Sequence, residues 1–228
     1  DLYLGMIGMH GSQASNVACN ECDLLIAVGC RFSDRVALQP DTFASQAKIV
    51  HIDIDRSEID KNVLTDHHII GSAKRVLELL NERLPQYHHQ SWKEHILPLR
   101  EPQVVEEGDK LTPGQILDAI EKAVPRDAIV ATDVGQHQMW SIQHFHFNYP
   151  GQLLTSGGFG TMGFGLGAAI GAKVGNPDKV VVHTTGDGCF RMNCHELATV
   201  EHYHLPIITV VFNNGTLGMV RQWQHLIY

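Results

Sequence analysis

The sequence contains no apolar run that approaches the about 20 residues a helix needs to cross a bilayer. It also lacks a basic excess, because 17 lysines and arginines stand against 25 aspartates and glutamates, a formal net charge of −8. A surface of this sign argues against nucleic acid and anionic membranes as partners. It leaves room for a phosphorylated small ligand, since helix N-termini and metal ions bind phosphate whatever the net charge.

A regular cysteine framework is absent as well. The five cysteines are odd in number and irregularly spaced, which suits a reducing compartment, and we expect no signal peptide. Cys19 and Cys22 have C-x-x-C spacing, but no second such pair completes a zinc site. We therefore interpret the two as small apolar side chains on one helix face, with a redox or zinc role as the alternative.

The apolar pattern predicts an α/β fold. Continuous apolar runs at 23–29 and 48–54 suit strands that are buried on both faces. A helix with apolar residues at helical spacing covers 73–84 and stops before Pro85. Residues 86–111 break this rhythm and are predicted to form an interdomain linker with one short helix.

A second α/β block begins at Thr112, which is a predicted N-cap, with Pro113 at the first helical position and Gln115 completing a capping box. Its later elements are strands at 128–133, 179–185 and 207–213, a helix from 136, a glycine-rich run at 156–175, and a helix over about 194–203. The prediction is two doubly wound parallel-sheet domains, at 1–85 and 112–228, joined by 86–111. Because no initiator Met opens the sequence, we expect part of a longer protein, with the second domain incomplete at its C-terminus.

Two polar motifs follow strands of the second block. They are G-D-G at 186–188 and N-N at 213–214, and Asn214 lies 27 residues after Asp187. A right-handed crossover makes the two strands parallel and brings their ends to one edge of the sheet. The Asp187 carboxylate, the Asn214 amide oxygen and the Thr216 backbone carbonyl could then bind one Mg²⁺ ion, which needs few protein oxygens. Each motif alone is also a common turn, so a pair of ordinary turns is the alternative.

Together the two motifs resemble the signature of thiamine-diphosphate enzymes. The resemblance extends to 133–140, DVGQHQMW, and to 156–163, SGGFGTMG. It implies that thiamine diphosphate contacts Gly135, Gln136, His137, Gly160, Met162, Gly186, Gly188, Met192, Met219 and Val220. For His137 the alternative is a hydrogen bond to a neighbouring loop, and for Met192 it is ordinary core packing.

The string LGMVRQWQ at 217–224 resembles the acetohydroxyacid (acetolactate) synthases in particular. That family joins a two-carbon unit from pyruvate to a second 2-keto acid, pyruvate or 2-ketobutyrate, in branched-chain amino-acid biosynthesis. The resemblance implies a catalytic pocket lined by Met192, Met219 and Trp223; a packed core aromatic is the alternative for Trp223. The family's activating glutamate comes from a separate N-terminal domain and has no match here, so Glu196 and Glu201 are not assigned that role. The chain alone is expected to be inactive.

The first block resembles the flavin-binding middle domain of the same synthases, at 8–11, 29–36 and 51–54. The resemblance implies a structural FAD that contacts Met9, His10, Gly29, Arg31, Arg35, Asp53 and Ile54. Surface ion pairs are the alternative for the two arginines. The family also implies a homodimer or homotetramer, a small regulatory subunit as a further partner, and a cytoplasmic location, or a plastid or mitochondrion in a eukaryote.

Two other functions stay open. One is another thiamine-diphosphate decarboxylase, oxidase or carboligase acting on 2-keto acids, against which the string at 217–224 counts. The other is a nucleotide-binding module without catalysis. That function predicts a G-x-G-x-x-G motif directly after the first strand of a block, and no such motif stands there in either block. The glycines at 158–163 have this spacing, but no clear buried strand precedes them.

Overall fold

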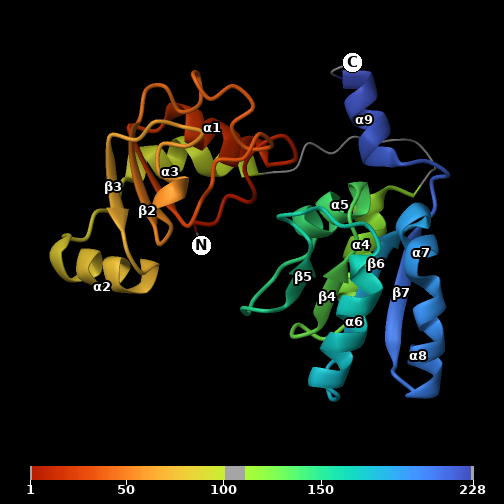
Figure 1. Cartoon of the computed structure of the whole chain (residues 1–228). Helices are drawn as coiled ribbons and strands as arrows, with labels where there is room; N and C mark the ends of the chain where they lie inside the picture. The colour runs from red at the N-terminus through yellow and green to blue at the C-terminus, as the bar shows by residue number, and fades with distance from the viewer. Residues whose placement is uncertain (1, 101–110, 227–228) are drawn as a thin grey trace. The chain divides into compact units, whose positions relative to one another are not determined.

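A computed structural model describes residues 2–100 and 111–226 (Figure 1). The chain forms two compact units, residues 1–105 and 106–228. Each contains a parallel β-sheet with helices, which confirms the predicted α/β fold class. Among the described helices, none has the length and apolar character needed to span a membrane.

The first unit is built on a three-stranded sheet with the order β1-β2-β3. Its strands are β1 (Leu24–Val28), β2 (Lys48–Asp53) and β3 (His67–Ile70). Its helices are α1 (Gln13–Glu21), α2 (Ala73–Arg83) and α3 (Gln90–Ile96), with short 3-10 turns η1 (Arg56–Glu58) and η2 (Leu97–Arg100). Both α3 and η2 pack against α1. The described part of the predicted linker, 86–100, therefore contacts the first unit. Residues 101–110 of the predicted linker lie outside the described residues. The domain boundaries stay a prediction.

Strand β1 corrects one expectation. Ala27 belongs to the core of this unit, but Leu24, Ile26 and Val28 on the opposite face are 50%, 45% and 39% exposed. The prediction of a strand buried on both faces is therefore wrong for β1. The physical reason is that only one face is packed within the described part of this unit, by core residues that include Phe32.

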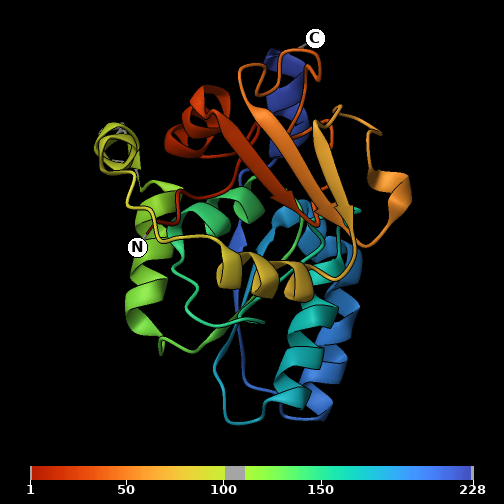
Figure 2. The same ribbon diagram turned by 90° about the vertical axis from the view of Figure 1, so that its left-hand side faces the viewer.

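The second unit is built on a four-stranded parallel sheet with the order β5-β4-β6-β7. Its strands are β4 (Ile129–Thr132), β5 (Leu153–Thr155), β6 (Val181–Gly186) and β7 (Ile207–Phe212). Its helices are α4 (Pro113–Ala123), α5 (Gln136–His144), α6 (Phe164–Gly175), α7 (Asp187–Asn193), α8 (Leu197–His202) and α9 (Gly218–Leu226), with the 3-10 turn η3 (Cys194–Glu196). Figure 2 shows the layers of this unit, with α4 on one side of the strands and α6 and α8 on the other.

The central strand β4 is buried on both faces. Ile129 and Ala131 pack with Ala169 and Ala172 of α6, whereas Val130 between them packs with Leu117 of α4. This alternation follows from the two-residue period of a strand. The capping box of α4 is confirmed, with the Thr112 side chain accepting from the backbone of Gln115 and the Gln115 side chain accepting from the backbone of Thr112.

Several short elements go beyond the prediction. Helix α7 starts directly at Asp187, ahead of the helix expected over about 194–203. The glycine-rich run at 156–175 divides into a loop and the helix α6. The short strands β3 and β5 and the helix α9 were not predicted. Helix α1 contains Cys19 and has Cys22 as its C-cap, but its bounds were not predicted.

Candidate functional site

A pocket of about 220 Å³ lies in the second unit, where β4, β6 and β7 end. It is lined by Val134, Gly135, Gln136, His137, Trp140, Gly160, Met162, Gly186, Asp187, Gly188, Cys189, Phe212, Asn214, Thr216, Leu217, Gly218, Met219 and Val220. Parallel sheets place their ligand sites at this edge, because the loops that leave the strands meet there. The structure thus gathers the residues predicted for thiamine diphosphate and the metal around one hollow, all except Met192. Trp223, predicted for the catalytic pocket, does not line it either.

The pocket wall depends on glycines beside a histidine ring. A Cβ built at Gly186 would lie 3.0 Å from Nδ1 of His137, and one at Gly135 would lie 2.7 Å from its Cε1. Gly135 also has φ 154° and is the N-cap of α5. The two glycines therefore give the imidazole its place between the end of β6 and the start of α5.

His137 is almost fully buried in this wall, with 5% of its surface exposed. Within the described part of the chain, its Nε2 has no hydrogen-bond partner. Burial lowers the pKa of His137 to about 4, although the nearby Asp133 carboxylate acts to raise it. The ring is therefore neutral at neutral pH, with one unsatisfied nitrogen that suits a polar ligand.

The predicted metal ligands also lie in the wall. Asp187 is the first residue of α7, while Asn214 and Thr216 follow β7. The Asn214 Oδ1 accepts from the backbone N–H of Thr216 at 3.2 Å, which fixes this turn. No group of three or more His, Cys, Asp or Glu side chains in residues 2–100 and 111–226 could hold a metal ion. A magnesium site built from one carboxylate, one amide and one carbonyl does not need such a group.

Met192 and Trp223 lie outside the pocket lining. Met192 is 51% exposed on α7, where its Cβ lies against Gly163. Trp223 is half-buried on α9, and the neighbouring Gln222 accepts a 3.4 Å hydrogen bond from Gln136. The structure therefore brings α9 to the pocket, but it does not place the indole in the wall.

Some lining residues were missed from the sequence, among them Trp140, Cys189 and Leu217. Trp140 lies four positions after Gln136, so helical spacing would have placed it on the same face. Burial raises the pKa of Cys189, which keeps the thiol protonated and weakly reactive. All five cysteines of the chain are free thiols.

In the first unit, the residues predicted to bind flavin form two groups. The backbone N–H of Met9 donates to the carbonyl of Arg35 at 2.9 Å. Burial, with a smaller contribution from the Arg35 charge, lowers the pKa of His10. The backbone N–H of Gly29 donates to the carbonyl of Ile52 where β1 and β2 end, and Asp53 is the next residue after Ile52. Arg31 and Ile54 are exposed. The Arg35 side chain forms a 2.5 Å ion pair with exposed Asp34, the alternative that the sequence left open.

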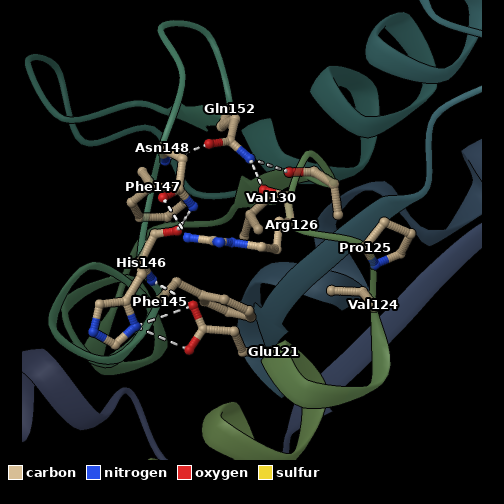
Figure 3. Close-up of a pocket in the computed structure, with 11 residues that line it drawn as sticks. Glu121, Val124, Pro125, Arg126, Val130, Phe145, His146, Phe147, Asn148 and Gln152 are labelled. Carbon is tan, nitrogen blue, oxygen red and sulfur yellow. Dashed lines mark hydrogen bonds and ion pairs between the residues drawn. The ribbon is translucent and has the colours of Figure 1, made fainter.

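A second pocket of about 220 Å³ lies at the opposite, N-terminal ends of β4 and β5 (Figure 3). Its polar side chains bind one another: His146 contacts Glu121 at 3.0 Å, and Arg126 donates to Asn148 at 3.3 Å. The Gln152 amide donates to the backbone carbonyl of Arg126 at 2.8 Å. None of the predicted site residues lies here, so the first pocket is the candidate site.

Comparisons with known proteins agree with this location. Residues 133–228 match the family described as "Thiamine pyrophosphate enzyme, C-terminal TPP binding domain", and residues 1–80 match "Thiamine pyrophosphate enzyme, central domain". The first match covers every lining residue of the candidate site.

Curated relatives are similar along the whole chain. The "Probable acetolactate synthase large subunit" of Methanocaldococcus jannaschii is 47% identical over 100% of this chain and 40% of its own length. The "Acetolactate synthase isozyme 2 large subunit" of Escherichia coli (strain K12) is 46% identical over 99% of this chain and 41% of its own length. "Acetolactate synthase 1, chloroplastic" of Nicotiana tabacum is 44% identical over 100% of this chain and 36% of its own length. The chain therefore spans about two fifths of these relatives.

Proposed function

Because the chain belongs to the thiamine pyrophosphate enzyme family, we propose that the pocket of the second unit binds thiamine diphosphate with Mg²⁺. We also propose that the whole protein is an acetolactate synthase. The observation that carries the first proposal is the gathering of the G-D-G, N-N and Gly135–His137 segments around one hollow. The second proposal is supported by the acetolactate synthase names of the relatives.

The residues present fit the cofactor's diphosphate. Helix α5 begins in the pocket wall after Gly135, and the first N–H groups of a helix have no acceptor within it. The buried Nε2 of His137, which has no hydrogen-bond partner among the described residues, is a further polar atom that a ligand could contact. Gly186 and Gly188 let the backbone approach a ligand closely. Asp187, Asn214 and the Thr216 carbonyl are the oxygen donors that would hold Mg²⁺, which would supply positive charge for the diphosphate.

Bound thiamine diphosphate supplies the carbanion-stabilising chemistry by which one 2-keto acid loses carbon dioxide and is joined to another. The chain's own part is to bind and orient the cofactor and to exclude water. Met162, Leu217, Met219 and Val220 give the pocket an apolar wall beside the polar diphosphate end. Cys189 stays a neutral thiol there, so it does not compete as a nucleophile. Met192 and Trp223 are proposed to act at the rim.

The metal assignment is tested by Asp187→Ala in the full-length protein. This change removes the one carboxylate of the proposed site, so thiamine diphosphate should no longer be retained at ordinary Mg²⁺ concentrations while the fold persists. Calorimetric titration of the cofactor measures the effect. Asp178→Ala is the matched control, because Asp178 is exposed and outside the pocket. Equal cofactor affinity in both variants contradicts the metal assignment.

For the first unit we propose a structural FAD near Met9, His10, Gly29, Arg31, Arg35, Asp53 and Ile54. The support is the closeness of His10 to the Arg35 guanidinium and the meeting of β1 and β2 at Gly29. An arginine on a diphosphate makes charge-assisted hydrogen bonds, which are among the stronger polar contacts. The exposed Asp34 partner of Arg35 is a weak competitor, since surface ion pairs are worth little.

The activity, the partners and the location of the whole protein are proposals as well. The relatives are named large subunits, which supports a small regulatory subunit as partner, and we propose a homodimer or homotetramer. A bacterial-type cytoplasmic location, or a plastid as in the tobacco relative's name, is proposed. Assay of the full-length protein with pyruvate should give acetolactate; acetaldehyde or acetate in its place would favour a decarboxylase or an oxidase.

A further inference from the structure

A buried carboxylate lies next to the candidate pocket. Asp133 directly follows β4, and 1% of its surface is exposed. Its Oδ2 accepts from the Thr185 hydroxyl at 2.8 Å and contacts Nε2 of His183 at 3.0 Å. Its Oδ1 accepts from the backbone N–H of Gly165 at 3.0 Å. An ionised carboxylate only accepts, so Nε2 of His183 carries the proton in this pair.

These three partners stand on the segments that form the pocket. Asp133 is followed by 134–137, which line one wall. His183 and Thr185 belong to β6, which leads into the G-D-G motif at 186–188. Gly165 is in the first turn of α6, directly after the loop that carries the lining residues at 160 and 162. One carboxylate therefore joins three wall segments that are distant in sequence.

The start of α6 depends on this carboxylate. The N-cap of α6 is Gly163, which has no side chain to accept from the first turn. Asp133 supplies that acceptor from the neighbouring strand. A Cβ at Gly165 would lie 2.7 Å from Nε2 of His183 and 2.9 Å from Oδ2 of Asp133, so the close approach requires glycine.

The carboxylate is satisfied although it is buried. Burial alone would raise the pKa of Asp133, but the hydrogen bonds from His183, Gly165 and Thr185 lower it below its ordinary value. An unpaired buried charge would be strongly unfavourable, and three donors offset that cost. Few side chains accept three hydrogen bonds in this geometry; an amide has one oxygen.

We propose that Asp133 is a positioning residue of the cofactor pocket, whose carboxylate holds the three wall segments in the arrangement that receives the diphosphate. This inference rests on the proposed function of the pocket. It assigns Asp133 no contact with the cofactor itself, since the residue does not line the pocket.

The test compares three variants of the full-length protein. Asp133→Ala should weaken binding of thiamine diphosphate with Mg²⁺ by about 10- to 100-fold, the range typical of outer-shell partners. Without cofactor, amide exchange should speed up by about 10-fold or more at 163–168 and 186–190, because a charge-assisted hydrogen bond is lost there. Asp133→Asn keeps one acceptor oxygen and should give intermediate values; it also carries the test if the alanine variant does not fold.

Thr132→Val is the matched control. Thr132 is equally buried on β4 and donates to the Thr155 hydroxyl at 2.7 Å, and Thr155 keeps a second donor in Gln138. Its cofactor affinity should match that of the unaltered protein. The proposal is overturned if Asp133→Ala binds cofactor normally, or if its faster exchange spreads evenly over the second unit, since a purely stabilising role predicts that pattern.

The amide-exchange measurement tests the role of Asp133 independently of whether the pocket binds thiamine diphosphate. If the unaltered protein fails to bind thiamine diphosphate, the proposed function is wrong. Exchange in the cofactor-free protein still decides the role of Asp133: a change confined to the two segments supports positioning of the pocket walls, and an even change refutes it.

Discussion

The pH dependence of stability should report the buried state of His137. Burial lowers its pKa from 6.5 to about 4 in the folded chain. Between these values the unfolded chain binds a proton that the folded chain does not, so stability is present above pH 6.5 and is lost as the pH falls toward 4. Integrated from about pH 7.5 to pH 4.5, this single group should reduce the free energy of unfolding by about 2.5 kcal/mol.

The perturbation is His137→Gln, which removes the titrating ring and keeps a polar side chain. The free energy of unfolding is measured by urea titration at several pH values in both proteins. The substitution shifts the variant's curve by a constant amount, but its slope with pH should be shallower than that of the unaltered protein. His225→Gln is the control, because His225 is an exposed histidine on α9 outside the pocket lining.

Parallel curves for the unaltered protein and His137→Gln would refute the reasoning. They would mean that the folded protein charges His137 as easily as the unfolded chain does. The ring would then be hydrated or paired with an anion, and a neutral imidazole in the pocket wall would be wrong. Asp133 does not affect this comparison. Because its pKa is lowered, the stability that depends on its charge is lost only as the pH falls below about 3.8, the ordinary pKa of an aspartate, which lies outside the range compared.

Three further predictions concern the pocket and the first unit. Gly218→Ala should weaken thiamine-diphosphate binding, measured by calorimetry, because a Cβ there collides with Oε1 of Gln136. Its control is Gly171→Ala on α6, where a Cβ meets no atom within 4 Å; this change should stabilise the fold by about 0.5–1 kcal/mol, measured by thermal unfolding. Trp223→Leu should lower the preference for 2-ketobutyrate over pyruvate as acceptor by about 10-fold or more, in a competition assay with both products quantified, and an unchanged ratio means that the indole only packs. Arg31→Ala combined with Arg35→Ala should lose FAD from the purified full-length protein, seen as lost flavin absorbance, and retained absorbance contradicts the proposed contacts.

The sequence predicted best where one local rule decides the structure. Thr112, Pro113 and Gln115 specify a helix start by themselves, and α4 begins there with its capping box formed. The G-D-G and N-N motifs follow long apolar strands, so the parallel sheet brings them to one pocket. In both cases the information lies within a few residues, or in the general rule that strand ends meet at one edge.

Prediction was weaker where packing decides. An apolar run alone does not show which faces of a strand are covered, and β1 proved to be packed on one face. Strands β3 and β5 have only four and three residues, too few for a periodic signal. The indole of Trp223 lies on a helix whose Gln222 is hydrogen-bonded to Gln136, 86 residues away in the sequence. No local pattern carries that information.

Strand β6 shows how a hidden site can still be recognised in such a sequence. Its first residues, Val181 and Val182, are fully buried apolar side chains, and its next three, His183, Thr184 and Thr185, are equally buried and polar. Each of these three side chains is hydrogen-bonded, which is necessary because an unpaired buried polar group costs about 1–3 kcal/mol. A strand that only packs in the core needs no buried polar side chains and so does not carry this possible cost. Polar residues concentrated at the carboxyl end of a buried strand therefore indicate a site to be held in place, and in this chain they lead directly into the G-D-G motif.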